Sequence, residues 1–127
     1  MTFAQEFGFT SHQLQALTSQ AFDLIDAGDL DGAIVVFDGL LVLNPDDARI
    51  QAALGSVFHQ QGKLSEARAA YDTALSLDAN TVLARVNRGE LRCKRGDLEG
   101  MEDLKIAAQL PSPVQARAQS LLRLYAR

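Results

Sequence analysis

The chain lacks most of the residues from which disulfides, metal centres and membrane anchors are built. Its 127 residues include one cysteine and two histidines, so an internal disulfide is excluded and the ligands for a structural metal site are too few. No apolar run reaches the ~18 residues that a membrane-spanning helix requires, and no basic segment precedes a hydrophobic one as in a signal peptide. We therefore expect a cytoplasmic protein without cofactor, metal or membrane contact.

The sequence motifs of enzymes are also missing. There is no glycine-rich phosphate loop and no His-Glu-x-x-His pair, and His12 and His59 are the only imidazoles that could act as general bases. A chain of this length forms one domain and leaves no room for a separate catalytic module. We expect no catalytic site, and hence a protein that is not an enzyme.

Basic residues are absent from the first 48 positions, which carry a net charge of −8, whereas residues 49–127 carry +4. This asymmetry could steer a charged partner or join two copies of the chain through their opposite halves, and a solvated surface with an accidental gradient explains it equally well. Nucleic acid is not an expected partner, because the basic residues are not interleaved with aromatics and the acidic half would repel phosphate.

What the sequence does contain is a repeat of 34 residues. Gly28, Gly62 and Gly96 are separated by this step, and a glycine before a run of helix formers marks a break between two helices. Four further columns keep the step, the last of them with a break in its chemistry: Ala21, Gly55 and Gly89; Leu30, Leu64 and Leu98; Ala33, Ala67 and Met101; Phe37, Tyr71 and Lys105.

These columns resemble the tetratricopeptide repeat, a pair of antiparallel helices with small residues, glycine and an aromatic at fixed positions. The resemblance implies an all-α fold, a right-handed superhelix of three helix-turn-helix repeats over about 14–47, 48–81 and 82–115, within a single domain at 11–127. We expect helices at about 11–27, 30–43, 47–61, 64–77, 81–95 and 98–110, the first begun by a capping box between Thr10 and Gln13.

The segments on either side of the repeats carry separate expectations. Ser112 as N-cap and Pro113 at the first helical position predict a capping helix over about 113–125. Its apolar residues should cover the flank of the last repeat: Val114, Ala118, Leu121, Leu122 and Tyr125. Residues 1–10 form an amino-terminal arm, which is either disordered or docks Phe3 and Phe7 on a second copy, giving a homodimer, or in the groove.

The repeat also predicts where a partner binds, because in this family the first helix of each pair lines a concave groove. The corresponding residues are Gln15, Thr18, Phe22, Ile25 and Asp26, then Arg49, Ala52, Ser56, His59 and Gln60, then Leu83, Val86, Glu90, Cys93 and Lys94. This mixture suits an extended or partly helical peptide with a few apolar anchors. For Ile25 and Val86 the alternative is simple burial against a neighbouring helix.

Two features of the groove helices require an interpretation. His59 and Cys93 share one repeat position and are expected as neighbours, but without a third group to orient them we interpret both as ordinary groove-lining residues. Four arginines form one stripe of the third repeat: Arg85, Arg88, Arg92 and Arg95. We expect their heads to pair with Glu99, Glu102 or Asp103, and the alternative is a face open to an acidic partner.

A closer resemblance rests on the three repeats, the closing helix and a set of individual residues: Phe22, Gly28, Ala33, Phe37, Asp47, Arg49, Leu54, Gly55, Gly62, Tyr71, Leu77, Asp78, Glu90, Gly96, Asp97 and Leu98. With these the chain is similar to the small bacterial chaperones of type III secretion translocators. The resemblance implies a cytosolic chaperone that holds an extended segment of a secreted, membrane-active client, with Thr18, Phe22, Ile25, Leu30 and Arg49 lining the client pockets. The alternative function is a general adaptor that assembles other proteins.

Overall fold

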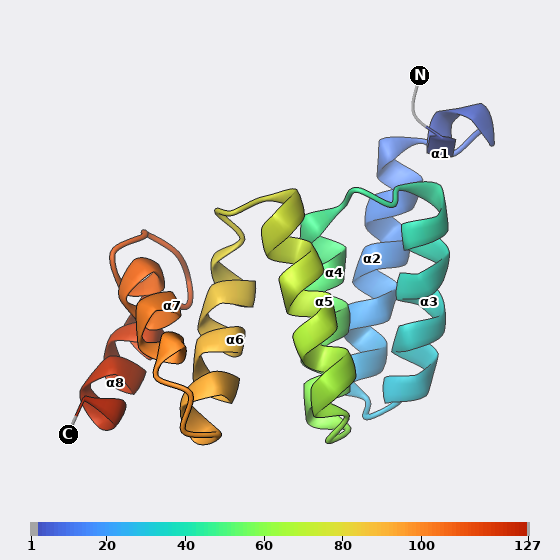
Figure 1. The fold of residues 1–127 in the computed structure, drawn as a ribbon. Coiled ribbons are helices and arrows are strands. Elements are labelled where there is room, and N and C mark those ends of the chain that lie inside the picture. Colours follow the sequence, from blue (N-terminus) through green and yellow to red (C-terminus); the bar gives the residue numbers. More distant parts are fainter. Residues whose placement is uncertain (1–2, 127) are drawn as a thin grey trace.

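A computed structural model describes residues 3–126, and within this range every regular element is an α-helix (Figure 1). Three antiparallel pairs follow one another along the chain: α2 (Ser11–Asp26) with α3 (Leu30–Leu43), α4 (Ala48–Gln60) with α5 (Leu64–Leu77), and α6 (Val82–Lys94) with α7 (Glu99–Ala108). A short helix α1 (Phe3–Glu6) precedes them and α8 (Gln115–Tyr125) packs on α7 at the other end. The all-α repeat fold expected from the sequence is confirmed.

The helices begin and end where local chemistry satisfies their free backbone groups. Thr10 and Gln13 form the predicted capping box, with Thr10 N–H bonded to Gln13 Oε1 at 2.9 Å and Gln13 N–H to Thr10 Oγ1 at 3.1 Å. Gly28, Gly62 and Gly96 end the first helices of the three pairs at φ of 84°, 77° and 79°, a region that glycine enters without a Cβ clash. The 34-residue glycine period is therefore a period of helix C-termini.

The capping helix begins later than its sequence predicts. Ser112 accepts a hydrogen bond from Val114 N–H through its hydroxyl at 3.2 Å, and Gln115 N–H bonds to Ser112 C=O at 3.2 Å. These bonds close a turn over Ser112 to Val114, so the assignment of Ser112 as N-cap and Pro113 as the first helical residue is wrong. The apolar face was predicted correctly: Ala118 is buried and the other four named residues pack against its cluster.

The core consists of three apolar clusters, each filled by a large side chain from the second helix of a pair. Phe37, Tyr71 and Leu104 are fully buried at these positions. Small residues on the facing helices allow the close approach: a Cβ placed on Gly55 would lie 2.5 Å from the Tyr71 ring, and one on Gly89 would lie 2.9 Å from Leu104 Cγ. The small residues of one repeat column therefore pack directly against the large residue on the partner helix of the same pair.

Helix α7 departs from the 34-residue period by one position. Leu104, not Lys105, takes the place of Tyr71, and Gly100 packs against Gly89 where the period would put Met101. As a result Leu98 is 79% exposed. One residue is about 100° of rotation on a helix, so this change presents a different face of α7 to α6.

The face of α7 that now meets α6 includes a buried carboxylate, Asp103, whose side chain is 3% exposed. Arg88 bonds it through Nη2 at 2.7 Å and Nε at 2.9 Å, Arg85 through Nη1 at 3.2 Å and Arg92 through Nη1 at 3.1 Å. Arg88 also reaches Asp72 at 3.0 Å, and the bonds to Asp103 and Asp72 raise its pKa. The predicted internal pairing of the arginine stripe is confirmed for these three residues, with Asp103 as the shared partner.

Some expectations for the amino-terminal arm fall outside the described structure. Residues 1 and 2, and the side chain of Phe3, are not described, so the shared face of Phe3 and Phe7 remains a prediction. Phe7 follows α1 and its side chain is 63% exposed. Ala4 is buried, and its carbonyl accepts the N–H of Phe9 at 3.0 Å.

Candidate functional site: two pockets along the first helices

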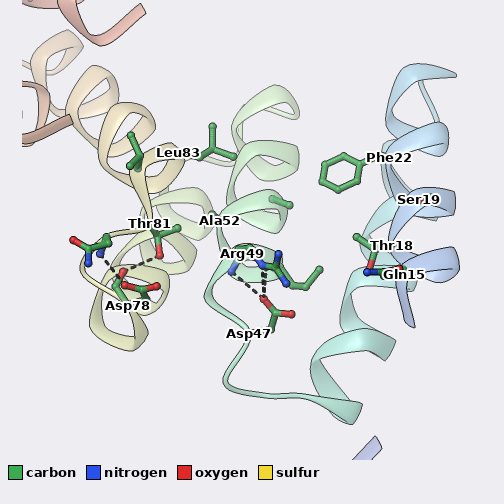
Figure 2. Close-up of a pocket in the computed structure, with 14 residues that line it drawn as sticks. Gln15, Thr18, Ser19, Phe22, Asp47, Arg49, Ala52, Asp78, Thr81 and Leu83 are labelled. Carbon is green, nitrogen blue, oxygen red and sulfur yellow. Dashed lines mark hydrogen bonds and ion pairs between the residues drawn. The ribbon is translucent and has the colours of Figure 1, made fainter. Parts of the chain in front are cut away.

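The larger cavity, about 770 Å³, lies between the first helices of the three repeats and is called here the first pocket. Figure 2 shows Phe22, Thr18 and Gln15 on α2 facing the α4 side, with Thr81 and Leu83 across from them on α6 and the turn before it. It is lined by Gln15, Thr18, Ser19, Phe22, Asp47, Arg49, Ile50, Ala52, Ala53, Asp78, Asn80, Thr81, Val82 and Leu83.

Phe22 is the principal apolar side chain of the first pocket. Its ring packs edge-on against Phe37 of the core, with centroids 5.7 Å apart and planes at 76°, yet 45% of the residue remains exposed. An aromatic ring held on one edge and open on the other offers a preformed apolar surface at little entropic cost. The pocket can therefore accept an apolar side chain beside Phe22.

Charged groups surround the mouth of the first pocket. Asp47 caps α4 by accepting from the N–H groups of Arg49 and Ile50 at 3.1 and 3.3 Å, while Asp78 accepts from Asn80 N–H at 2.9 Å. The Arg49 side chain is 91% exposed and its Nε lies 3.9 Å from Asp47. A surface pair of this kind holds the guanidinium weakly, so Arg49 is free to contact a bound peptide.

A smaller cavity of about 300 Å³, called here the second pocket, lies further along α4. It is lined by residues of four helices, α4, α5, α6 and α8. These residues are Ser56, His59, Gln60, Tyr71, Leu83, Asn87 and Arg117. Asn87 donates to Ser56 Oγ at 2.9 Å, and Arg117 of α8 donates to Asn87 Oδ1 at 2.8 Å. The same arginine pairs with Glu90 at 2.5 Å, and Glu90 pairs with Lys94 at 2.9 Å.

The pKa values of His59 and Glu90 are both lowered by their surroundings. Burial is the main cause that lowers the pKa of His59, whose Nδ1 lies 3.4 Å from Tyr71 Oη. Burial alone would raise the pKa of Glu90, but its bonds to Lys94 and Arg117 outweigh that cost and lower it. His59 is thus kept neutral and Glu90 charged near neutral pH.

The predicted groove residues do not all line one surface: some line the first pocket, some the second, and the others pack in the core or lie beside the pockets. Gln15, Thr18, Phe22, Arg49, Ala52 and Leu83 line the first pocket, and Ser56, His59, Gln60 and Leu83 line the second. Ile25 and Leu30 pack against the first core cluster, Asp26 is exposed near the end of α2, and Glu90 and Lys94 pair beside the second pocket.

For two residues the groove prediction is wrong. Val86 is fully buried with Leu104, Ala107 and Ala118, so the alternative reading of it as core is correct. Cys93 packs beside Gly100 of α7, where a Cβ on that glycine would lie 2.8 Å from Cys93 Sγ. His59 contacts Tyr71 instead of Cys93. In the part of the chain that the structure describes, no three His, Cys, Asp or Glu side chains gather as a metal site would require.

Several lining residues escaped sequence reasoning. Asp47 lies in the turn before α4, and Asp78, Asn80 and Thr81 lie in the turn before α6. Turn residues fall outside the helix positions that define the family groove. Arg117 belongs to the capping helix, for which only an apolar contact was expected. The polar residue Asn87 follows Val86 by one position, which is enough to turn it from the core to the second pocket.

A family model described as tetratricopeptide repeat matches residues 19–81 and 61–100. The chain belongs to the tetratricopeptide repeat family. No helix within residues 3–126 has both the length and the apolar character needed to cross a membrane.

Among solved structures, the chain is similar to the type III secretion translocator chaperone SycD of Yersinia enterocolitica, with 26% identity, a TM-score of 0.86 and coverage of 98% of both chains. SycD in complex with a peptide of the translocator YopD gives 25% identity and a TM-score of 0.79, covering 92% of this chain and 95% of that one. The translocator-chaperone resemblance drawn from the sequence is confirmed.

A curated relative of a different kind is cellulose synthase operon protein C of Xanthomonas axonopodis pv. citri. It is 29% identical over 113 residues, which is 86% of this chain. The chain spans only 8% of the length of that protein. The repeat unit therefore also occurs within a much longer protein.

Proposed function

We propose that this protein is a peptide-binding chaperone that holds an extended segment of a secreted, translocator-like client in the groove formed by α2, α4 and α6. The observation that carries the proposal is the first pocket, which is lined both by the half-exposed ring of Phe22 and by Arg49, whose side chain is exposed. Apolar pockets with a few polar groups at the mouth are suited to extended peptides, whose side chains alternate between pocket and solvent.

The choice of client follows from the likeness to SycD, whose complex contains a peptide of a translocator. A membrane-active client carries apolar segments that aggregate in water, and a groove that covers one such segment keeps the client dispersed until export. The chaperone would act in the cytoplasm, before the client leaves, and it would act by binding and without catalysis. Gln15, Thr18, Phe22, Arg49, Ala52 and Leu83 would form the client surface.

The experiment is co-expression with a translocator-like client, with the soluble client fraction and its co-purification as readouts. Phe22→Ala should reduce both several-fold, because it removes the main apolar surface of the first pocket. Val35→Ala is the matched control, since Val35 is 71% exposed on α3 and does not line either pocket. Equal client recovery with wild type and Phe22→Ala would refute the groove assignment.

A general adaptor is the second candidate, and it is favoured by the match to a small part of a long operon protein. An adaptor would bind folded partners without changing their solubility. Co-purification of a partner that stays soluble when this protein is absent would therefore support the adaptor and count against the chaperone.

A further inference from the structure

The second pocket differs from the first in being built around hydrogen-bond donors. Its lining includes the Arg117 guanidinium, the Gln60 amide and the His59 ring. Arg117 is tied through Nη1 to Asn87 and through Nη2 to Glu90, which uses two of its five N–H groups. With 43% of its side chain exposed, the remaining donors are open to a bound molecule.

The His59 ring adds a further polar group to the lining of the second pocket. Its Nδ1 lies 3.4 Å from Tyr71 Oη, which leaves Nε2 for a hydrogen bond with a bound molecule.

The charges beside the second pocket do not cancel. Arg117 and Lys94 are both paired with the single carboxylate of Glu90, whose side chain is 16% exposed. Two cations against one anion leave this cluster of three side chains with one net positive charge, and Arg117 is its member that lines the pocket. An incoming carboxylate would gain charge-assisted hydrogen bonds from Arg117 and would complete this charge balance.

From these features we infer that the second pocket is a subsite for an acidic side chain of the bound peptide. The inference rests on the proposed function and adds a specificity to it. The two pockets follow one another along α4 and share Leu83. From Ala52 to His59 a helix rises about 10 Å, which lies between the spans of two and four residues of an extended peptide, about 7 and 13 Å. Because side chains an even number of positions apart share one face of an extended chain, the recognised pattern is an apolar residue and an Asp or Glu two or four positions away.

The test is an array of synthetic 15-residue peptides that carry a central leucine with Asp, Asn, Lys or Leu two or four positions before or after it, probed with the full chain. Aspartate should increase affinity about tenfold over leucine and lysine in at least one direction, as a charge-assisted bond does, and this preference should weaken with added salt. If asparagine increases the affinity as much as aspartate does, the pocket recognises a neutral hydrogen-bond acceptor and not a negative charge. That result would overturn the inference.

Two variants test whether a preference for aspartate arises in the second pocket. Arg117→Gln should abolish it, with Arg123→Gln on the exposed side of α8 as matched control. Gln60→Glu places an anion in the pocket without removing any bond of Arg117 and cancels its net positive charge, so it should also remove the preference for aspartate, whereas Gln20→Glu outside both pockets should not. Peptides that bind without acidic preference would overturn this inference alone, and an array on which no peptide binds would overturn the proposed function itself.

Discussion

Removing the carboxylate of Asp103 should destabilise the protein more than removing any exposed acid. Asp103 is 3% exposed as a side chain and accepts bonds from Arg85, Arg88 and Arg92. In Asp103→Ala these three arginines, whose side chains are only 14–18% exposed, lose their common counter-ion. Removing one partner of a buried ion pair costs about 3–5 kcal/mol, and their partial exposure places the expected cost at the lower end.

The assay is chemical and thermal unfolding of the full chain. A loss of about 3 kcal/mol corresponds to a fall of about 10–15 °C in Tm for a domain of this size. Glu102→Ala is the matched control, because the Glu102 side chain is 71% exposed and pairs with Lys105 at 3.3 Å, and an exposed pair contributes about 0–1 kcal/mol.

A compensated variant separates the charge effect from the loss of packing. Arg88 and Arg92 lie 34 residues after Leu54 and Phe58, so Arg88→Leu and Arg92→Phe together restore the apolar pairing of the middle repeat. Adding them to Asp103→Ala should recover most of the lost stability. If Asp103→Ala costs less than about 1 kcal/mol, or if the triple variant is no more stable than the single one, the account of this cluster is refuted.

Three further predictions concern packing, backbone and pH. Gly55→Ala should cost about 1–3 kcal/mol in urea unfolding, because the new Cβ would lie 2.5 Å from the Tyr71 ring; an unchanged midpoint would contradict this. Gly62→Ala, at φ 77° with open space around it, should cost about 1 kcal/mol from backbone strain alone, and Gly62→Asn should cost less. Since burial lowers the pKa of His59 below its usual 6.5, the native state binds fewer protons than the unfolded state there, so stability should decrease as pH falls through 6.5. His59→Gln should flatten that decrease between pH 7 and 5, while the same change at exposed His12 should not.

The fold could be read from the sequence because helix termini and core contacts recur at one interval. Glycine at a left-handed C-terminus and a small residue opposite an aromatic are local requirements, and both are visible as columns. The shift of α7 was not foreseen because extending the period put Met101 and Lys105 in the core. The spacing of Gly100, Leu104 and Ala107 does mark the face of α7 that is buried. The 34-residue period points to a different face, and the sequence alone does not show which of the two packs against α6.

The site was predictable only in part, for a geometric reason. First-helix positions follow from the repeat, and Thr18, Phe22 and Ala52 do line the first pocket. The turns that close the first pocket lie outside the first-helix positions, and the capping helix that reaches the second pocket has no repeat position. Their contribution depends on how successive units stack, which a linear pattern does not encode. Val86 is the opposite case, because its repeat position faces the groove in the family but lies in the core here.

The carboxylate of Asp103, which joins α6 to α7, also determines which helices can be exchanged with those of another repeat protein. In the first two repeats the paired helices meet through apolar residues, so a helix from a related repeat brings a compatible surface. Helix α6 brings three arginines that share Asp103, and Arg88 also pairs with Asp72 of α5, so Arg85 and Arg92 in particular need an acid at the position of Asp103. In consensus design or repeat shuffling, α6 and α7 should therefore be transferred together as a pair.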